Sequence, residues 1–290
     1  MRLLRTGPKD AERPCAVDRD GVVRCLSDWV PDWTGDALAP DALAEMAGRL
    51  ARSAHELPEV RLDEVRTGPP VPAGGQIISV GLNYRCHAAQ ADMPIGAEPV
   101  ISTKSPWSLA GPHDDLVIPP GAKRVDWEVE LAVVIGAEAR YLPDEDAATA
   151  VISGYCTAND VSERSWLLDR GGQWVKGKSF PTFAPLGPYL VTPEESGDVT
   201  ALRLTTRVNG KPMQDAKAGD MVFAVPWLIW YLTQFMVLRP GDVVLTGSPA
   251  GVALRRPDEP YLRPGDVIEV EIEGLGAQRQ RCRAHEEVTG

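Results

Sequence analysis

Short apolar runs of strand length, separated by glycine and proline, limit the fold of this 290-residue chain more than any other feature. The chain holds 27 glycines and 26 prolines, and both residue types interrupt regular structure. Several segments have the apolar or alternating pattern of β-strands: 76–80, 128–135, 151–157, 202–208, 242–246 and 267–273. We therefore expect an α+β fold that is mostly β, with a rolled or closed sheet and peripheral helices.

Two hairpin turns are visible in the sequence. The turn DRDG at 18–21 separates the short apolar runs 15–17 and 22–25. Asn209-Gly210 is the strongest short hairpin signal, and it ends the alternating segment 202–208. Both turns predict antiparallel pairing of neighbouring strands.

A division into two domains follows from composition. Apolar residues recur at helical spacing over 41–53, which predicts a helix there. With the first hairpin it forms a small N-terminal domain, residues 1–70. Residues 67–75 (TGPPVPAGG) are rich in proline and glycine and are expected to be a linker. Residues 71–290 are expected to form the second, larger domain.

The charge balance excludes some partners. The net charge is −11 and the pI is about 4.9, whereas nucleic acid and anionic membrane both reward clustered Lys and Arg. With 43% hydrophobic residues the chain builds a sizeable core. An anionic substrate must then find local positive charge, from a metal ion or from a few placed basic residues.

Nothing in the sequence predicts export or membrane insertion. The five cysteines are odd in number and form no CxxC pair, which fits reduced thiols in the cytoplasm. Charges are too dense in the first ten residues for an apolar leader. Residues 221–238 carry no charge, but they include Pro226, Thr233 and Gln234, so we predict a buried helix rather than a membrane span.

Two carboxylates begin one predicted strand and point the same way. Side chains alternate along a strand, so Glu128 and Glu130 share a face that continues with Ala132 and Val134. Two acids at the start of an apolar face repel each other unless a cation lies between them. The alternative is a strand whose first residues reach solvent.

A third acid, Asp160, follows the next apolar strand. Three hard oxygen ligands, with no clustered Cys or His, suit Mg²⁺ or Mn²⁺ and leave positions for water and a chelating substrate. Glu269, Glu271 and Glu273 also share a face, but no apolar residue joins it. We expect that second group to be a solvated outer surface.

Other residues are candidates with ordinary structural alternatives. His87 stands alone in GLNYRCHAAQ, and a lone histidine on a short helix is usually structural. Lys178 and Arg164 are either site cations or surface charges. The turn LTGSPAG at 245–251 offers amides and hydroxyls for a carboxylate, although turns of small residues are common.

Taken in order, these segments resemble the fumarylacetoacetate hydrolase family. The likeness covers residues 76–283, and its most specific part is the carboxylate strand with the distant Asp160. The stretches GYCTANDVSERSWLLDRGGQWVKGKSF, YLTQFMVLRPGDVVLTG and EIEGLGAQRQR are similar to the branch that contains 2,4-diketo-3-deoxy-L-fuconate hydrolases. The first 70 residues match only loosely.

The resemblance implies a mixed β-roll core, a homodimer and one divalent cation per chain. It places Mg²⁺ or Mn²⁺ on Glu128, Glu130 and Asp160. It also implies that His87 is the base on a mobile lid, residues 83–98. We expect a small oxo-acid as substrate, with neither nucleic acid nor membrane as partner.

The resemblance assigns the remaining site residues to substrate. Lys178 and Arg164 are expected as cationic partners of the substrate or its intermediate. The turn of Thr246, Gly247 and Ser248 is expected to hold the carboxylate. A 2,4-dioxo acid would then be hydrolysed at its C3–C4 bond to pyruvate and a second acid.

The chain departs from the family pattern beside the expected base. Hydrolases and decarboxylases of the family usually place Glu three residues after the lid His, and here that residue is Gln90. An amide orients an imidazole but does not stabilise its protonated form. Pro181, Ser248 and Ala253 stand where the branch has Asp, Thr and Gly.

Three hypotheses follow from an intact metal set and an altered water-activating set. The first is a metal-dependent hydrolase of acylpyruvate-type acids. The second is a tautomerase, decarboxylase, dehydratase or cyclisation enzyme on a β-dicarbonyl or 2-oxo acid. The third is a non-catalytic, metal-binding member of the family.

Overall fold

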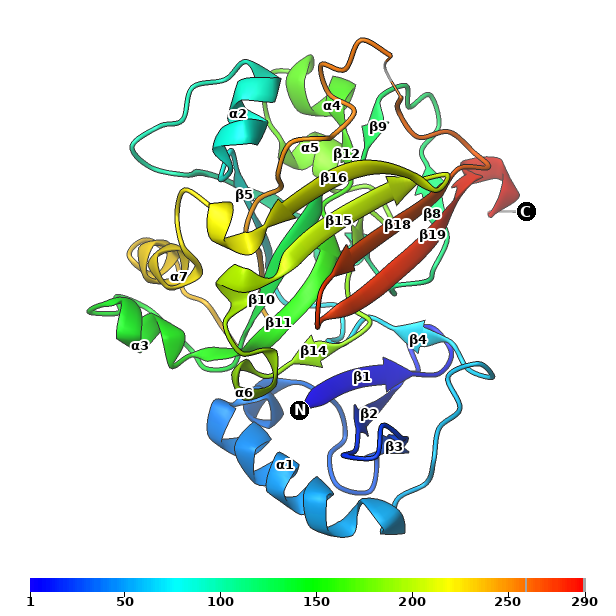
Figure 1. The fold of residues 1–290 in the computed structure, drawn as a ribbon, viewed down its shortest axis with the longest axis vertical. Coiled ribbons are helices and arrows are strands. Elements are labelled where there is room, and N and C mark those ends of the chain that lie inside the picture. The colour runs from blue at the N-terminus through cyan, green and yellow to red at the C-terminus, as the bar shows by residue number, and fades with distance from the viewer. Residues whose placement is uncertain (259, 289–290) are drawn as a thin grey trace.

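The computed structural model describes residues 1–258 and 260–288. A ten-stranded mixed sheet runs the length of the molecule in the order β3-β2-β1-β14-β11-β10-β17-β5-β6, with β4 paired to β1 (Figure 1). Its strands are β1 Arg2–Thr6, β2 Arg13–Val17, β3 Val23–Cys25, β4 Thr67–Gly68, β5 Ile77–Gly81, β6 Val100–Lys104, β10 Val129–Ile135, β11 Ile152–Asn159, β14 Leu190–Val191 and β17 Val243–Leu245.

A second, five-stranded sheet packs over the centre of the first in the order β16-β15-β18-β19-β8. Its strands are β16 Lys211–Lys217, β15 Arg203–Val208, β18 Val267–Ile272, β19 Gly276–Ala284 and β8 Leu116–Ile118. Two short pairs join β9 Val125–Asp126 to β12 Ser162–Glu163, and β7 Leu109–Ala110 to β13 Ala184–Pro185. The helices are peripheral: α1 Pro40–Ser53, α2 Arg85–Ala91, α3 Glu145–Thr149, α4 Arg164–Leu168, α5 Val175–Lys178, α6 Pro193–Ser196 and α7 Val225–Thr233.

The central strand β10 is buried along its whole length because both of its faces meet apolar layers. Odd-numbered residues such as Leu131 and Val133 pack in the core shared with the second sheet. Even-numbered residues, Ala132 and Val134, pack in the core shared with the N-terminal segment. This alternation fixes the direction of Glu128 and Glu130, which precede Ala132 on the same side.

Most of the expected elements are confirmed. Each predicted strand segment overlaps an observed strand, the hairpins at 18–21 and 209–210 join antiparallel pairs, and the helix over 41–53 is α1. The fold class is α+β with a minority of helix, as predicted.

The predicted linker is wrong in its first half. Residues 67–71 are buried, and Thr67-Gly68 pairs with β1 as β4. Strand β1 also pairs with β14 at Arg2 and Leu3. The N-terminal segment therefore extends the same sheet that carries the carboxylates.

The uncharged stretch 221–238 contains one short helix, α7, of nine residues. No helix in residues 1–258 and 260–288 is long and apolar enough to cross a membrane. One side of α7 is buried through Leu228, Ile229 and Leu232. The prediction of a buried helix is confirmed, because every residue of Val225–Thr233 is buried or half-buried, while Phe235 beyond its end is 53% exposed.

Candidate active site and metal centre

The three predicted acids meet where two paired strands end. Val129 pairs with Asn159, and the Asp160 N–H donates to the Glu128 carbonyl at 2.9 Å, so Asp160 lies beside the start of β10. One carboxylate oxygen from each of Glu128, Glu130 and Asp160 lies within 4.8 Å of the others. All three residues are buried, so the alternative of a solvated strand end is excluded.

Three buried cations surround the acids. Lys178 Nζ donates to Glu128 Oε2 at 3.0 Å and to Asp160 Oδ2. Arg164 Nη2 donates to Glu128 Oε1 at 2.7 Å. Lys104 Nζ donates to Asp160 Oδ1 at 2.5 Å. The ammonium and guanidinium groups predicted to face substrate are therefore held by the carboxylates themselves.

The cluster is not electrically balanced around Glu130. Burial, with the neighbouring carboxylates of Asp160 and Glu128, raises the pKa of Glu130 well above its usual value. Burial also acts to raise the pKa of Glu128, but the charges of Arg164 and Lys178 overcome it and lower that pKa. Glu130 is thus the acid for which the protein supplies too little positive charge.

This imbalance fits a divalent metal ion. The hydrogen bond that reaches Glu130 comes from the Gly247 N–H at 2.7 Å, which is a neutral donor. A divalent cation among the three carboxylates would offset the repulsion that raises the pKa of Glu130. All-oxygen ligands of this kind suit hard cations, so these residues fit the expected metal.

His87 projects from α2 toward the carboxylates. Its Nε2 lies 3.9 Å from Glu128 Oε1, and the residue is 7% exposed. Burial lowers the pKa of His87, and the Glu128 carboxylate only partly opposes this. The Pro249 carbonyl also acts to raise this pKa. In the structure, however, the buried Nδ1 of His87 has no hydrogen-bond partner among the described residues. The lowered pKa favours the neutral imidazole, which is the form that accepts a proton.

Gln90, the expected neighbour of His87, binds a different partner. Its Nε2 donates to the carbonyls of Val252 and Leu254, each at 2.9 Å, and its Oε1 accepts from the Gly251 N–H at 2.7 Å. The expected contact with the imidazole is thus replaced by three hydrogen bonds to the 251–254 loop. Gln90 thus fastens α2 to this loop.

The turn expected to hold a carboxylate is partly committed elsewhere. Thr246 Oγ1 donates to the Leu131 carbonyl at 2.8 Å, and the Gly247 N–H binds Glu130. Gly247 has a φ of +101°, and a Cβ there would lie 2.7 Å from the Asn83 Cβ, so the turn requires glycine. Of the three predicted residues, Ser248 lines the cavity.

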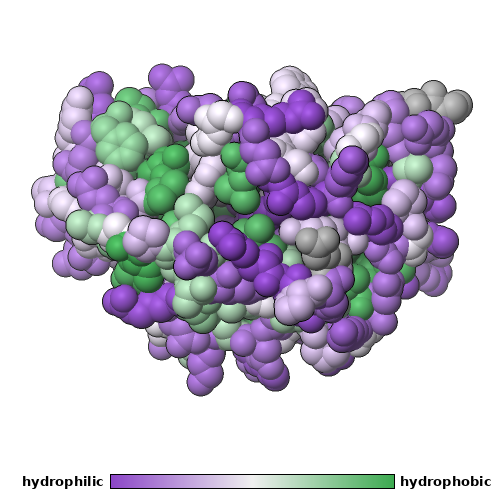
Figure 2. Space-filling model, turned by 90° about the horizontal axis from the view of Figure 1, so that it is seen from above, coloured by the Kyte–Doolittle hydropathy of each residue, from purple (hydrophilic) through white to green (hydrophobic). Residues whose placement is uncertain are grey.

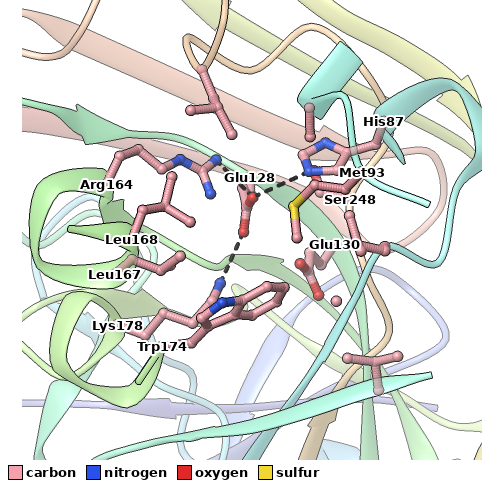
Figure 3. Close-up of a pocket in the computed structure, with 15 residues that line it drawn as sticks. His87, Met93, Glu128, Glu130, Arg164, Leu167, Leu168, Trp174, Lys178 and Ser248 are labelled. Carbon is pink, nitrogen blue, oxygen red and sulfur yellow. Dashed lines mark hydrogen bonds and ion pairs between the residues drawn. The ribbon is translucent and has the colours of Figure 1, made fainter. Parts of the chain in front are cut away.

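A small cavity lies above Glu128 and Glu130 (Figure 3). Arg164 approaches Glu128 from the side opposite His87, and Lys178 approaches it from below in this view. The cavity volume is about 30 Å³, which is enough for water but not for an oxo-acid. The structure therefore shows the cavity closed around the acids, and His87 and Ala91 of α2 form part of its wall.

The sequence comparison decides the family. The profile described as fumarylacetoacetate (FAA) hydrolase C-terminal matches residues 76–283. The chain belongs to the fumarylacetoacetate hydrolase family. The resemblance seen in the sequence is confirmed over the same residues, and members of this family are typically hydrolases or isomerases.

Full-length relatives of this family member extend the match to the N-terminal segment. A Burkholderia multivorans protein that carries the provisional name of hydrolase, without a substrate, is 47% identical over 285 residues, covering 98% of this chain and 99% of that protein. A fumarylacetoacetate hydrolase from Exiguobacterium antarcticum is 30% identical, with a TM-score of 0.82 over 98% of this chain and 100% of that one.

Solved structures of similar chains carry both reaction types. A maleylpyruvate hydrolase from Sphingobium is 27% identical, with a TM-score of 0.80 over 98% of this chain and 100% of that chain. A 5-carboxymethyl-2-hydroxymuconate delta-isomerase from Mycobacterium smegmatis is 30% identical, with a TM-score of 0.76 over 98% and 99%. The fold of this family member therefore does not by itself select the reaction.

Sequence reasoning missed three buried residues that shape the site. Lys104 holds Asp160, and Asp126 accepts from Arg164 Nε at 2.8 Å and from two amides of the 251–254 loop. Gln214 Nε2 donates to Ser248 Oγ at 2.8 Å. For Asp126 a signal was available, because it precedes the carboxylate strand. Lys104 and Gln214 come from distant strands that no local pattern connects to the site.

Proposed function

We propose that this chain is a Mg²⁺- or Mn²⁺-dependent hydrolase that cleaves the C–C bond of a small 2,4-dioxo acid. The products are pyruvate and a second acid. The observation that carries the proposal is the buried set of three carboxylates within 4.8 Å, faced by an imidazole whose pKa is lowered. Acids and a neutral base in one enclosed site suit activation of water beside a metal-bound oxo-acid.

The chain's own groups divide the chemistry among them. When bound at Glu128, Glu130 and Asp160, the divalent cation supplies Lewis-acid stabilisation of negative charge on the oxo-acid. His87 takes a proton from water, which attacks the C4 carbonyl, and returns it to C3 as the C3–C4 bond breaks. The Lys178 ammonium offsets charge on the oxygen of the tetrahedral intermediate.

The test is release of pyruvate from acylpyruvates by protein stripped of metal and then supplied with Mg²⁺ or Mn²⁺. We expect activity to return with the ion and to fall at least about 100-fold in His87→Ala, because general-base catalysis is lost. His55→Ala is the matched control, since that ring is 78% exposed. Binding of Mg²⁺ and oxalate without turnover of any oxo-acid would instead support a non-catalytic member of the family.

A second candidate is an isomerase or another enolate-forming enzyme on a β-dicarbonyl or 2-oxo acid. It is favoured by Gln90, whose amide is bound to the 251–254 loop and supplies no acidic partner to His87. Metal-dependent loss of the enol absorbance, or release of CO₂, with no pyruvate formed, would replace hydrolysis by this candidate.

The proposal includes a homodimer located in the cytoplasm, without nucleic acid or membrane as partner. The net charge of −11 supports the exclusion of anionic partners. Light scattering on the purified full-length chain measures the assembly, and a mass of one chain would contradict the dimer.

A further inference from the structure

The cavity beyond the carboxylates is closed by apolar side chains to which the proposed chemistry gives no role. Leu167 and Leu168 come from α4, and Trp174 immediately precedes α5. Met93 comes from the lid and Leu254 from the loop that Gln90 binds. Figure 3 shows the two leucines, Trp174 and Met93 around the space beside Glu128. We call these five residues the apolar wall.

The wall is held in place by the backbone of β5. A Cβ on Gly81 would lie 2.2 Å from Trp174 Cζ3, so the indole occupies the position that any other residue would fill. Leu167 is 3% exposed, whereas Leu168 is 37% exposed at the rim. On the face seen in Figure 2, which is the upper end of the molecule in Figure 1, small hydrophobic patches lie between hydrophilic residues.

The charges in the cavity are already paired. Among the described residues that line it, the permanent cations are Arg164 and Lys178. Arg164 donates to Asp126 and Glu128, and Lys178 donates to Glu128 and Asp160. A second carboxylate carried into the wall by a substrate would therefore have to share a cation that already binds an acid, which is unfavourable for a buried charge.

A polyhydroxylated tail meets a similar difficulty. The hydroxyl that lines the cavity among the described residues belongs to Ser248, and its Oγ already accepts from Gln214 Nε2 at 2.8 Å. Ser248 keeps one O–H to donate, so several sugar hydroxyls moved from water to this wall would lose most of their hydrogen bonds. Alkyl groups would instead gain apolar contact.

We propose that the apolar wall selects a short, uncharged, apolar tail on the 2,4-dioxo acid. This inference rests on the proposed function for the orientation of the substrate, with its oxo-acid end at the carboxylates. It names the five wall residues as determinants of specificity.

The test compares two ligands that share the oxo-acid end and differ in the tail. N-ethyloxamate and N-oxalylglycine have the same chain length, but the second ends in a carboxylate. Calorimetric titration of the full-length protein with Mg²⁺ present should give a Kd for N-ethyloxamate at least about tenfold below that for N-oxalylglycine. Equal affinities, or tighter binding of N-oxalylglycine, would overturn the proposal.

A charge placed at the rim of the wall should reverse the preference. Leu168→Lys supplies a cation where a tail carboxylate would arrive, and it should shift the ratio of the two affinities about tenfold toward N-oxalylglycine. Val175→Lys is the matched control, because Val175 is 39% exposed on neighbouring α5 and does not line this cavity. If the ratio of the two affinities is unchanged in Leu168→Lys, the apolar wall does not contact the tail of the ligand.

The outcomes separate this inference from the proposed function. If the protein binds the two oxamates with different affinities but releases no pyruvate from any 2,4-dioxo acid, the proposed hydrolase activity is wrong and the tail preference stands. If pyruvate forms faster from acids with a carboxylate tail than from acids with an alkyl tail, the hydrolase activity stands and the tail preference is wrong. Failure to bind oxalate with Mg²⁺ removes the site and both proposals.

Discussion

At the scale of single residues, Gln90 holds helix α2 against the 251–254 loop. Both of its N–H donors are used on the carbonyls of Val252 and Leu254. Gln90→Glu would place a carboxylate against those two oxygens, so we expect kcat/KM for pyruvate release to fall about tenfold. Gln173→Glu makes the same charge change at an exposed site and should leave kcat/KM unchanged. A gain in Gln90→Glu would show that the new carboxylate reaches His87.

The acids were predictable from sequence, and much of what surrounds them was not. Glu128 and Glu130 stand two residues apart before an apolar run, which local periodicity shows directly. Lys104 has no such context, and it reaches Asp160 only because β6 pairs with β5 at the edge of the sheet. The orientation of Gln90 likewise depends on a loop more than 150 positions away in the chain.

At the scale of elements, helix α2 is anchored at its start by Asn83. Its Nδ2 donates to the carbonyls of Thr246 and Phe223 at 2.8 and 3.0 Å, and its Oδ1 accepts from the Phe223 N–H at 2.7 Å. Asn83→Leu keeps the volume but leaves these backbone groups unpaired. We expect a loss of about 3 kcal/mol in the free energy of unfolding, measured by urea denaturation.

Gln173→Leu is the control for that substitution, because it removes an exposed amide and should change stability by less than about 0.5 kcal/mol. If both variants unfold at the same urea concentration, the amide of Asn83 does not anchor the helix.

Strands were the elements that sequence predicted best, because each carries its own apolar run or alternation. The segment 202–208 alternates, and its residues Leu204, Thr206 and Val208 are buried as that pattern requires. Strand β4 was missed because Thr67-Gly68 lies in a run of prolines and glycines that has no alternation. It becomes a strand only through pairing with β1, which is a long-range contact.

At the scale of the whole molecule, acid should weaken the fold in a defined range. Burial lowers the pKa of His113, although the neighbouring Asp114 carboxylate acts to raise it. A histidine in the unfolded chain has a pKa of about 6.5, so the folded state binds fewer protons below that value. Stability is therefore intact above about pH 6.5 and declines as the pH falls through it. Burial lowers the pKa of His87 as well, so both rings contribute in this range.

Urea denaturation at pH 7 and at about pH 5.5 measures this effect. We expect the midpoint to fall with acid in the wild type and to fall less in His113→Gln, which removes one of the two rings whose pKa is lowered. His55→Gln, with a side chain that is 78% exposed, should behave as the wild type. An identical pH dependence in wild type and His113→Gln would contradict the assignment.

The volume of about 30 Å³ above the carboxylates has a consequence for inhibitors. A molecule larger than water needs the walls of this cavity to move, and α2, which Gln90 holds to the 251–254 loop, is one of these walls, so we expect association to be slower than diffusion. Oxalate-like compounds with a fitting tail should then show slow-onset inhibition, with progress curves that bend over time. A substitution that weakens the hydrogen bonds of Gln90 to the 251–254 loop should straighten those curves while the inhibitor still binds.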